Sequence, residues 1–167
     1  TRTLFSHNDS TFFRVVNDDG LRAVLKLLPE QKTIHPDALN TYRQVQIPNM
    51  PTLYDYGKWQ NSDYLVMQLL SGEPLDSCRI SSSEVIKEVI PGLSSALSGL
   101  HSMGLLHNDV KPDNILWSAE TQNAWLIDLD TITLSDCQDD VGGTPAYMAP
   151  ELLFSGAKKK RSSASDI

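Results

Sequence analysis

HNDVKPDNIL, at residues 107–116, gathers charged and amide side chains into a short loop and then turns apolar. Pro112 prevents a helix from running through the loop, because proline has no backbone N–H to donate. The spacing is specific: Lys111 follows Asp109 by two residues and Asn114 follows it by five. A polar loop that leads into an apolar strand is typical of sites where a rigid scaffold positions reactive groups. We therefore treat this segment as a candidate catalytic loop.

Two further motifs follow in order. Residues 125–127, WLI, form a predicted hydrophobic strand that leads into DLD at 128–130, and residues 143–151 read GTPAYMAPE. Together the three motifs resemble the eukaryotic-type protein kinase family, with its H-R-D-x-K-x-x-N loop, D-F-G metal motif and A-P-E segment. The resemblance covers nearly the whole chain. It implies an α+β, protein-kinase-like fold, with a small antiparallel sheet lobe and one helix at 1–70 and an incomplete, mainly helical lobe at 71–167.

Composition narrows the class of protein. With 167 residues, 40% of them hydrophobic, the chain can bury one sizeable core or two small lobes. The net charge of −7 argues against a nucleic-acid partner. No apolar run approaches the roughly 18 residues of a membrane-spanning helix, and we expect no membrane partner and no signal peptide. The oligomeric state stays open.

Two other features bear on location and completeness. The two cysteines fit no metal-binding spacing and suggest a reducing compartment, so we expect a cytoplasmic protein. The basic run at 158–161 offers a nuclear signal as the alternative, although a solvated loop is the favoured reading. The chain is short for a kinase domain and begins with Thr, so we expect either a fragment or a truncated protein that completes its core elsewhere. In both cases we expect exposed apolar surface and low stability.

Hydrophobic patterning predicts the main elements. Strands are expected at 12–16 and 21–27, with a hairpin turn at 17–20 in which Gly20 supplies a positive φ. Two more strands are expected at 53–56 and 64–70, joined by a polar turn through Gly57 and residues 61–63. Helices are expected from about 36 to 46 and from about 83 to 102. The second has a capping-box pattern at Ser81 and a kink or late start at Pro91.

The resemblance implies a nucleotide site. The strand lysine, Lys26, matches the V-A-I-K lysine that holds the α and β phosphates of ATP. Without the other motifs, a lysine in this position would be interpreted as a surface residue on an edge strand. Met67 is placed at the back of the adenine pocket, and residues 68–70 offer hinge backbone groups. The implied nucleotide contacts are Lys26, Val24, Met67, Gln68, Leu70 and Leu116.

The resemblance also implies the chemistry. Asp109 would orient the acceptor hydroxyl and take its proton, and Lys111 would meet the γ-phosphate charge. Asn114 and Asp128 supply the oxygen atoms that Mg²⁺ prefers. Thr144, together with Lys111, is typical of Ser/Thr kinases. The implied function is ATP- and Mg²⁺-dependent phosphorylation of Ser or Thr on protein substrates. The alternative is that the aspartates of these motifs only form turns and helix caps and have no catalytic role.

Several neighbouring residues are assigned supporting roles. His101 and His107 are expected to be structural, and Asp166 is expected to anchor the backbone of the catalytic loop. Residues 131–142 are expected to form a short polar loop. Thr131, Thr133 and Ser135 in this loop are candidate phosphate acceptors; the alternative is that their hydroxyls are only exposed to solvent.

The chain departs from the family pattern at four places. The segment LFSHNDST at 4–11 has no glycine, and the helix at 36–46 has no Glu to pair with the strand lysine. Asp37 could pair with the strand lysine in place of the missing Glu. The alternative is that Asp37 only interacts favourably with the helix dipole from the first turn. Leu129 and Asp130 replace the Phe and Gly of the metal motif. Asn108 replaces the Arg of H-R-D, so we expect activity without activation-loop phosphorylation.

These departures keep two other classes of function open. A pseudokinase that acts as a binding or regulatory module is favoured by the missing glycines and the missing Glu. A small-molecule phosphotransferase shares the logic of the H-x-D loop. The GTPAYMAPE segment argues against the second, because it is the protein-substrate feature of the family.

Overall fold

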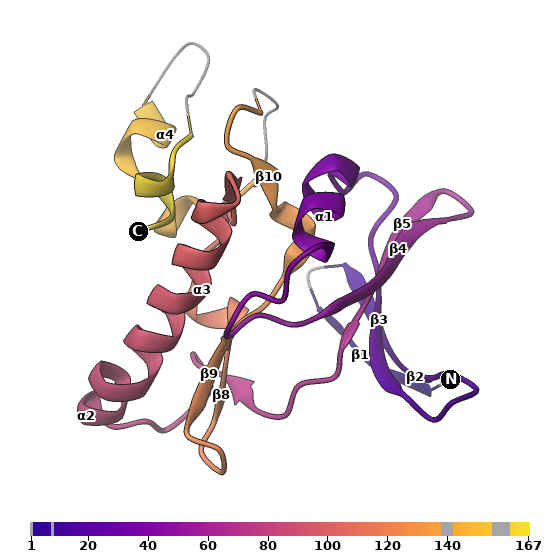
Figure 1. The fold of residues 1–167 in the computed structure, drawn as a ribbon, viewed down its shortest axis with the longest axis horizontal. Helices are drawn as coiled ribbons and strands as arrows, with labels where there is room; N and C mark the ends of the chain where they lie inside the picture. Colours follow the sequence, from indigo (N-terminus) through magenta and orange to yellow (C-terminus); the bar gives the residue numbers. More distant parts are fainter. Residues whose placement is uncertain (1, 8, 138–141, 155–160) are drawn as a thin grey trace. The chain divides into compact units, whose positions relative to one another are not determined.

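The computed structural model describes residues 2–7, 9–137, 142–154 and 161–167 (Figure 1). Its strands are β1 (Arg2–His7), β2 (Ser10–Val16), β3 (Arg22–Leu27), β4 (Leu53–Trp59), β5 (Ser62–Gln68), β6 (Glu73–Pro74), β7 (Leu105–Leu106), β8 (Ile115–Ser118), β9 (Asn123–Leu126) and β10 (Thr133–Leu134). Its helices are α1 (Pro36–Arg43), α2 (Ser82–Glu84), α3 (Ile90–Ser102) and α4 (Pro150–Phe154).

The chain forms two compact units. The first comprises residues 1–34 and 51–70, and the second comprises residues 35–50 and 71–167. Helix α1 therefore groups with the second unit, whereas the sequence assigned it to the segment 1–70. The division at residue 70 stays a prediction. The α+β, kinase-like fold class is confirmed, with an antiparallel sheet in one unit and most of the helical residues in the other.

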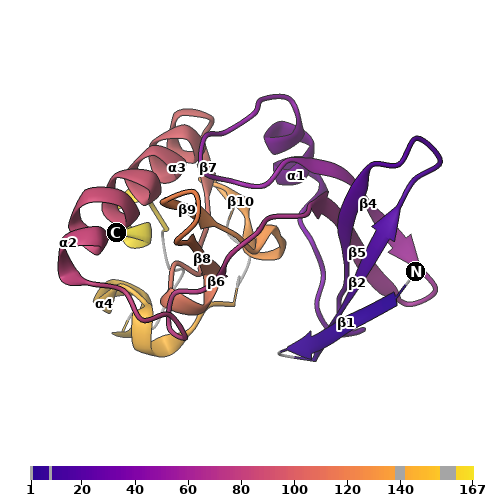
Figure 2. The same cartoon turned by 90° about the horizontal axis from the view of Figure 1, so that it is seen from below.

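The first unit is a five-stranded antiparallel sheet in the order β1-β2-β3-β5-β4 (Figure 2). The hairpin predicted between β2 and β3 is confirmed. Gly20 has a φ of 82°, and its N–H donates to the carbonyl of Asn17 at 3.0 Å. The N–H of Leu21 donates to Asn17 Oδ1 at 2.7 Å, so the Asn side chain closes the turn as well.

The strand boundaries differ from the prediction in two places. The first strand was predicted at 12–16, whereas β1 runs to His7 and β2 begins at Ser10, with Asp9 in the turn at a φ of 61°. The second turn lies at Gln60, which has a φ of 54°, and Gly57 lies inside β4 opposite Tyr64. A Cβ at Gly57 would come within 3.0 Å of the Tyr64 hydroxyl, so the glycine makes room for that ring and does not turn the chain.

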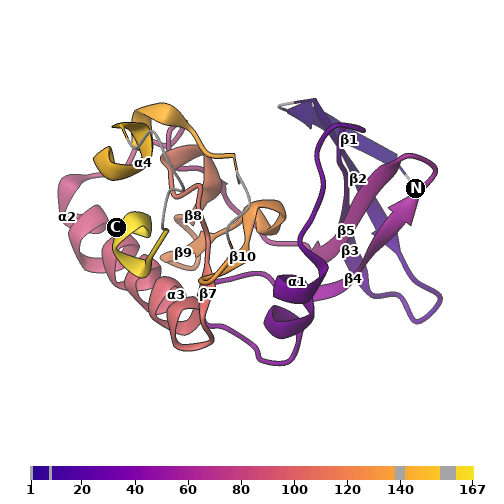
Figure 3. The same ribbon diagram turned by 90° about the horizontal axis from the view of Figure 1, so that it is seen from above.

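The helices of the second unit start where the sequence predicted. Helix α1 begins at Pro36, and its buried residues are Ala38, Leu39 and Tyr42. It ends at Arg43 and not near residue 46, with Gln44 as its C-cap, whose N–H donates to the carbonyl of Thr41. Helix α1 contacts β10, and α3 runs alongside β7 and β9 (Figure 3).

The disturbance predicted near Pro91 is a π-helical turn. The side-chain oxygen of Ser81 accepts the N–H of Glu84, and Glu84 reaches back to the N–H of Ser81, which confirms the capping box. Residues Val85–Val89 then form the π-helical turn, which widens the helix before α3. No helix in the described ranges is long and apolar enough to span a membrane.

The small sheets of the second unit carry the candidate site. Strands β6, β8 and β9 form one sheet, and β7 and β10 form a two-stranded ladder. The apolar residues around them are almost fully buried: Leu105, Leu106, Leu126, Leu129 and Ile132. The loop at 107–114 is therefore held between two short, buried strands, which fixes its position within the unit.

Candidate active site

Asp109 lies at the centre of the polar contacts on the loop after β7. Its Oδ1 accepts the backbone N–H of Thr144 at 2.9 Å and the Thr144 hydroxyl at 2.8 Å. Its Oδ2 accepts Asn114 Nδ2 at 3.0 Å and lies 2.9 Å from Lys111 Nζ. The structure thus brings together Asp109, Lys111 and Asn114 with Thr144, all of which the sequence analysis singled out.

These contacts keep the carboxylate of Asp109 ionised. Burial alone would raise its pKa, but hydrogen bonds from Lys111 and Thr144 outweigh burial and hold the pKa below its ordinary value of 3.8. A carboxylate with a lowered pKa is a weak base, so it is better suited to orienting a hydroxyl than to removing its proton early. In phosphoryl transfer, orientation of the attacking group is the larger requirement.

Lys111 and Thr144 form a relay on one side of this carboxylate. Lys111 Nζ donates to the Thr144 hydroxyl at 2.8 Å, and that hydroxyl in turn donates to Asp109. Lys111 is only 8% exposed, so its charge acts in a partly desolvated setting where electrostatic interactions are stronger than in water. One hydroxyl therefore fixes the geometry of both charged side chains.

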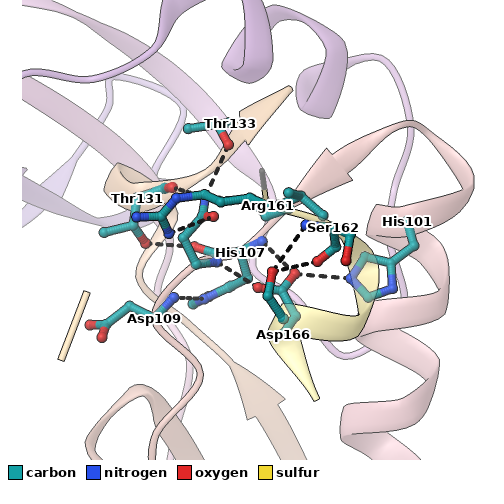
Figure 4. Close-up of polar contacts among 11 residues, drawn as sticks. His101, His107, Asp109, Thr131, Thr133, Arg161, Ser162 and Asp166 are labelled. Carbon is teal, nitrogen blue, oxygen red and sulfur yellow. Dashed lines mark hydrogen bonds and ion pairs between the residues drawn. The ribbon is translucent and has the colours of Figure 1, made fainter. Parts of the chain in front are cut away.

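Asp166 anchors the loop backbone, as the resemblance implied. Its Oδ2 accepts the N–H of His107 at 2.9 Å, and its Oδ1 accepts the N–H of Asn108 at 2.8 Å. His101 Nε2 lies 2.9 Å from the same Oδ2, so the structural role expected for His101 is confirmed. Figure 4 shows these contacts converging on Asp166.

His107 also has the structural role that was expected. Its Nε2 donates to the carbonyl of Ile127 at 2.8 Å, and its Nδ1 accepts the N–H of Asp109 at 3.4 Å. A ring that accepts at Nδ1 must be neutral. Complete burial lowers its pKa, an effect that the nearby Asp166 carboxylate opposes. The neutral ring therefore ties the loop to the segment that follows β9.

The two predicted metal ligands lie at one end of the β8–β9 hairpin. Asn114 directly precedes β8, and its carbonyl accepts the N–H of Ile127 at 2.8 Å, one residue before Asp128. Asn114 Nδ2 donates to both the carbonyl and the carboxylate of Asp109, which leaves its Oδ1 for a cation. Asp128 has a left-handed φ of 76°. An amide oxygen and a carboxylate oxygen are both ligands that suit Mg²⁺, which takes few protein ligands and completes its shell with waters and phosphate oxygens.

Three of the predicted nucleotide contacts share one face of the sheet in the first unit. Val24 and Lys26 are two residues apart on β3, and Val24 pairs with Met67 on β5, so register places all three on one face. Lys26 is 5% exposed, and its ammonium nitrogen lies 5.6 Å from the centroid of the Phe12 ring. Lys26 is therefore a buried cation on the sheet and not a surface lysine.

The other predicted contacts lie at the ends of strands. The N–H of Gln68, at the end of β5, donates to the carbonyl of Thr52 at 2.9 Å, and Leu70 follows in irregular backbone. Leu116 lies in β8 of the second unit, opposite Pro74. Asp37 is exposed in the first turn of α1, and its carbonyl accepts the Thr41 hydroxyl. Asp37 and Lys26 belong to different compact units, so their pairing stays a prediction.

Two sequence-based expectations around the loop are wrong. Thr131 and Thr133 are not solvated: they are 6% and 1% exposed, and the Thr131 hydroxyl donates to the carbonyl of His107 at 2.8 Å. Arg161 is not part of a solvated loop, because it is 6% exposed and its Nη1 donates to Asn108 Oδ1 at 3.1 Å. The rest of that basic run, residues 158–160, lies outside the described residues.

The chain is similar in sequence to known proteins. Residues 10–167 match the protein kinase domain family. The Hormonally up-regulated neu tumor-associated kinase of Homo sapiens is 36% identical over 139 residues, which cover 75% of this chain and 18% of that protein. The Serine/threonine-protein kinase Pkn1 of Myxococcus xanthus is 30% identical over 151 residues, 79% of this chain and 22% of that protein. The Probable serine/threonine-protein kinase fhkC of Dictyostelium discoideum is 27% identical over 153 residues, 86% and 25% respectively. The chain spans a quarter or less of each relative.

Proposed function

The chain belongs to the protein kinase family, and on this premise we propose that it transfers the γ-phosphoryl group of ATP to Ser or Thr hydroxyls of protein substrates. The observation that carries the proposal is the set of contacts around Asp109. Its carboxylate is ionised, and Lys111, Asn114 and Thr144 hold it in place. The match to relatives whose names describe Ser/Thr kinases supports the choice of acceptor.

In this mechanism the chain's own residues position the reacting groups and neutralise the charge of the phosphates. Asp109 accepts a hydrogen bond from the substrate hydroxyl, aligns it with the γ-phosphorus and takes its proton as the bond forms. Lys111 balances the charge of the transferred group, while Lys26 holds the α and β phosphates. Asn114 Oδ1 and the Asp128 carboxylate would hold Mg²⁺, which supplies charge neutralisation for the phosphates. Val24, Met67 and Leu116 give apolar contact to adenine, and the backbone at residues 68–70 binds its edge.

A second candidate function is a pseudokinase that binds partners without catalysis. Two observations favour it. The turn between β1 and β2 carries Asp9 at a φ of 61° and no glycine, so side chains occupy the segment that covers phosphates elsewhere in the family. In addition, α1 contains no Glu to pair with the strand lysine.

The experiment that separates these functions is transfer of labelled phosphate from Mg·ATP. Mixed proteins and small hydroxylated compounds serve as parallel acceptors, and labelled protein is hydrolysed to identify the phosphorylated amino acid. Label on Ser or Thr of protein supports the proposal. Label on small acceptors alone supports a small-molecule phosphotransferase. No transfer from a sample that melts cooperatively supports the pseudokinase.

A further inference from the structure

Asn108 occupies the motif position where the family has a charged Arg, and its side chain is fully engaged. Its Nδ2 donates to the carbonyl of Leu106 at 3.3 Å, to the carbonyl of Thr131 at 2.7 Å and to the Thr133 hydroxyl at 3.0 Å. Thr131 and Thr133 begin the segment that follows the metal motif, and Leu106 ends β7. The amide thus ties this segment to the catalytic loop at the end of the β7–β10 ladder.

The same side chain is bound from a second direction. Arg161 Nη1 donates to Asn108 Oδ1 at 3.1 Å, although Arg161 lies 53 residues further along the chain. Arg161 lies two residues before the 3-10 helix Ser163–Asp166, and Asp166 accepts the backbone N–H of Asn108. Asn108 has a φ of 69°, a left-handed conformation that Asn tolerates better than most residues. Figure 4 shows the side chain of Arg161 close to Thr131.

We propose that Asn108, Thr131, Thr133 and Arg161 form a clasp that fixes the catalytic loop without any phosphate, so that Asn108 and Arg161 are positioning residues for Asp109. The proposal rests on the proposed function. An Arg at position 108 could donate to the same carbonyls, but it could not accept the guanidinium of Arg161, because a guanidinium has no acceptor atom and carries the same charge. The Asn amide instead uses two carbonyls and a hydroxyl that are always present, and it also accepts the buried guanidinium of Arg161.

The clasp also changes which hydroxyls are open to modification. The Thr131 hydroxyl donates to His107 and the Thr133 hydroxyl accepts from Asn108, and both side chains are buried. A phosphoryl group on either would have to break the clasp. Phosphorylation at these two positions would therefore open the loop and would not order it.

The test uses variants that separate the two halves of the clasp. Asn108→Asp keeps the oxygen that faces Arg161 but turns an oxygen toward the carbonyls of Leu106 and Thr131, and Asp tolerates the left-handed φ. Asn108→Gly also tolerates that φ and removes the whole side chain. Arg161→Met removes the guanidinium and keeps the apolar stem. Arg79→Met is the matched control, because Arg79 is exposed.

The first readout is amide hydrogen exchange at residues 131–135 in phosphatase-treated protein. We expect slow exchange in the parent and in Arg79→Met, and at least tenfold faster exchange in Asn108→Asp, Asn108→Gly and Arg161→Met. The second readout is kinetic. The clasp variants should lose roughly 10- to 100-fold in kcat at nearly constant KM for ATP, because misplacement of a catalytic group acts on the chemical step.

The outcomes are distinguishable. The clasp is overturned if the phosphatase-treated parent exchanges fast at residues 131–135. It is also overturned if Asn108→Asp and Arg161→Met exchange as slowly as Arg79→Met. Loss of parental activity on phosphatase treatment would overturn it as well. If the parent transfers no phosphate before treatment, the proposed function fails, and hydrogen exchange alone then decides whether the clasp exists.

Discussion

At the residue scale, the environment of Asp109 sets the chemistry. Its carboxylate is buried and lies within 3.0 Å of one cation, one amide and one hydroxyl. Each of these donors stabilises the ionised form, and the folded chain keeps that form although burial opposes it. The residue can therefore orient a hydroxyl throughout the neutral pH range.

The Thr144 hydroxyl should control the pH profile of transfer. Thr144→Val keeps the volume but removes the hydroxyl that bridges Lys111 and Asp109. The pKa of Asp109 should then rise toward its ordinary value, so the acidic limb of kcat/KM should move to higher pH and kcat should fall about tenfold. Thr144→Ser, which keeps the hydroxyl, is the control. A Val variant with the parental profile would show that the relay has no influence on Asp109.

His107 should make stability fall as the solution becomes acidic. Its pKa in the folded chain lies below the ordinary 6.5, so the unfolded chain binds a proton first. The contribution of the neutral ring is complete above pH 6.5 and is lost below it, by up to about 1.4 kcal/mol per pH unit. The measurement is denaturant unfolding of the parent and His107→Gln between pH 7.5 and 5. The variant should show the flatter dependence, and equal slopes would contradict the assignment.

At the element scale, the approach to β6 depends on a glycine. Gly72 has a φ of 148°, and a Cβ there would lie 2.8 Å from the carbonyl oxygen of Trp117 in β8. Gly72→Ala should therefore destabilise the chain by about 2 kcal/mol or more, since alanine is strained at this φ and the backbone of β8 would have to move to relieve the contact. Thermal and denaturant unfolding give the value. Gly142→Ala, where a Cβ meets nothing within 4 Å, should stay within about 0.5 kcal/mol of the parent.

The sequence predicted some elements well because their signals are local. The β2–β3 turn, the start of α1 and the Ser81 capping box each depend on a few adjacent residues. The strand β1 and the π-helical turn at Val85–Val89 were missed, because each depends on a neighbouring element that the local pattern does not reveal. The glycine in β4 was taken for a turn residue, whereas it accommodates a cross-strand tyrosine ring.

The same reasoning explains which site residues could be predicted. Asp109, Lys111 and Asn114 follow from motif spacing, and the contacts among them lie within one compact unit. The role of Asp166 follows from the resemblance to the family. Arg161 could not be predicted, because its contact with Asn108 spans 53 residues and its neighbours form an ordinary basic run.

At the scale of the whole molecule, the residues predicted to contact nucleotide are divided between the two units. Val24, Lys26 and Met67 belong to the first unit, and Leu116 belongs to the second, as does the predicted metal ligand Asp128. Nucleotide binding is therefore a property to be measured on the whole chain.

Mg·ATP should raise the melting temperature of the parent, because a ligand that binds only the folded state stabilises it. Lys26→Met should abolish the shift, since it removes the buried cation proposed to bind phosphate. Lys87→Met is the control, because Lys87 is exposed on the π-helical turn and should leave the shift unchanged. The measurement is thermal unfolding at several Mg·ATP concentrations. A full shift in the Lys26 variant would remove this residue from the proposed site.

The most direct test of the proposed activity compares the parent with Asp109→Asn in transfer of labelled phosphate from Mg·ATP to protein. The substitution keeps size and polarity but removes the carboxylate that orients the hydroxyl and accepts its proton. We predict transfer by the parent and a loss of at least a hundredfold in the variant, with both samples melting cooperatively. Equal transfer by the two proteins, or no transfer by a cooperatively folded parent, would contradict the account.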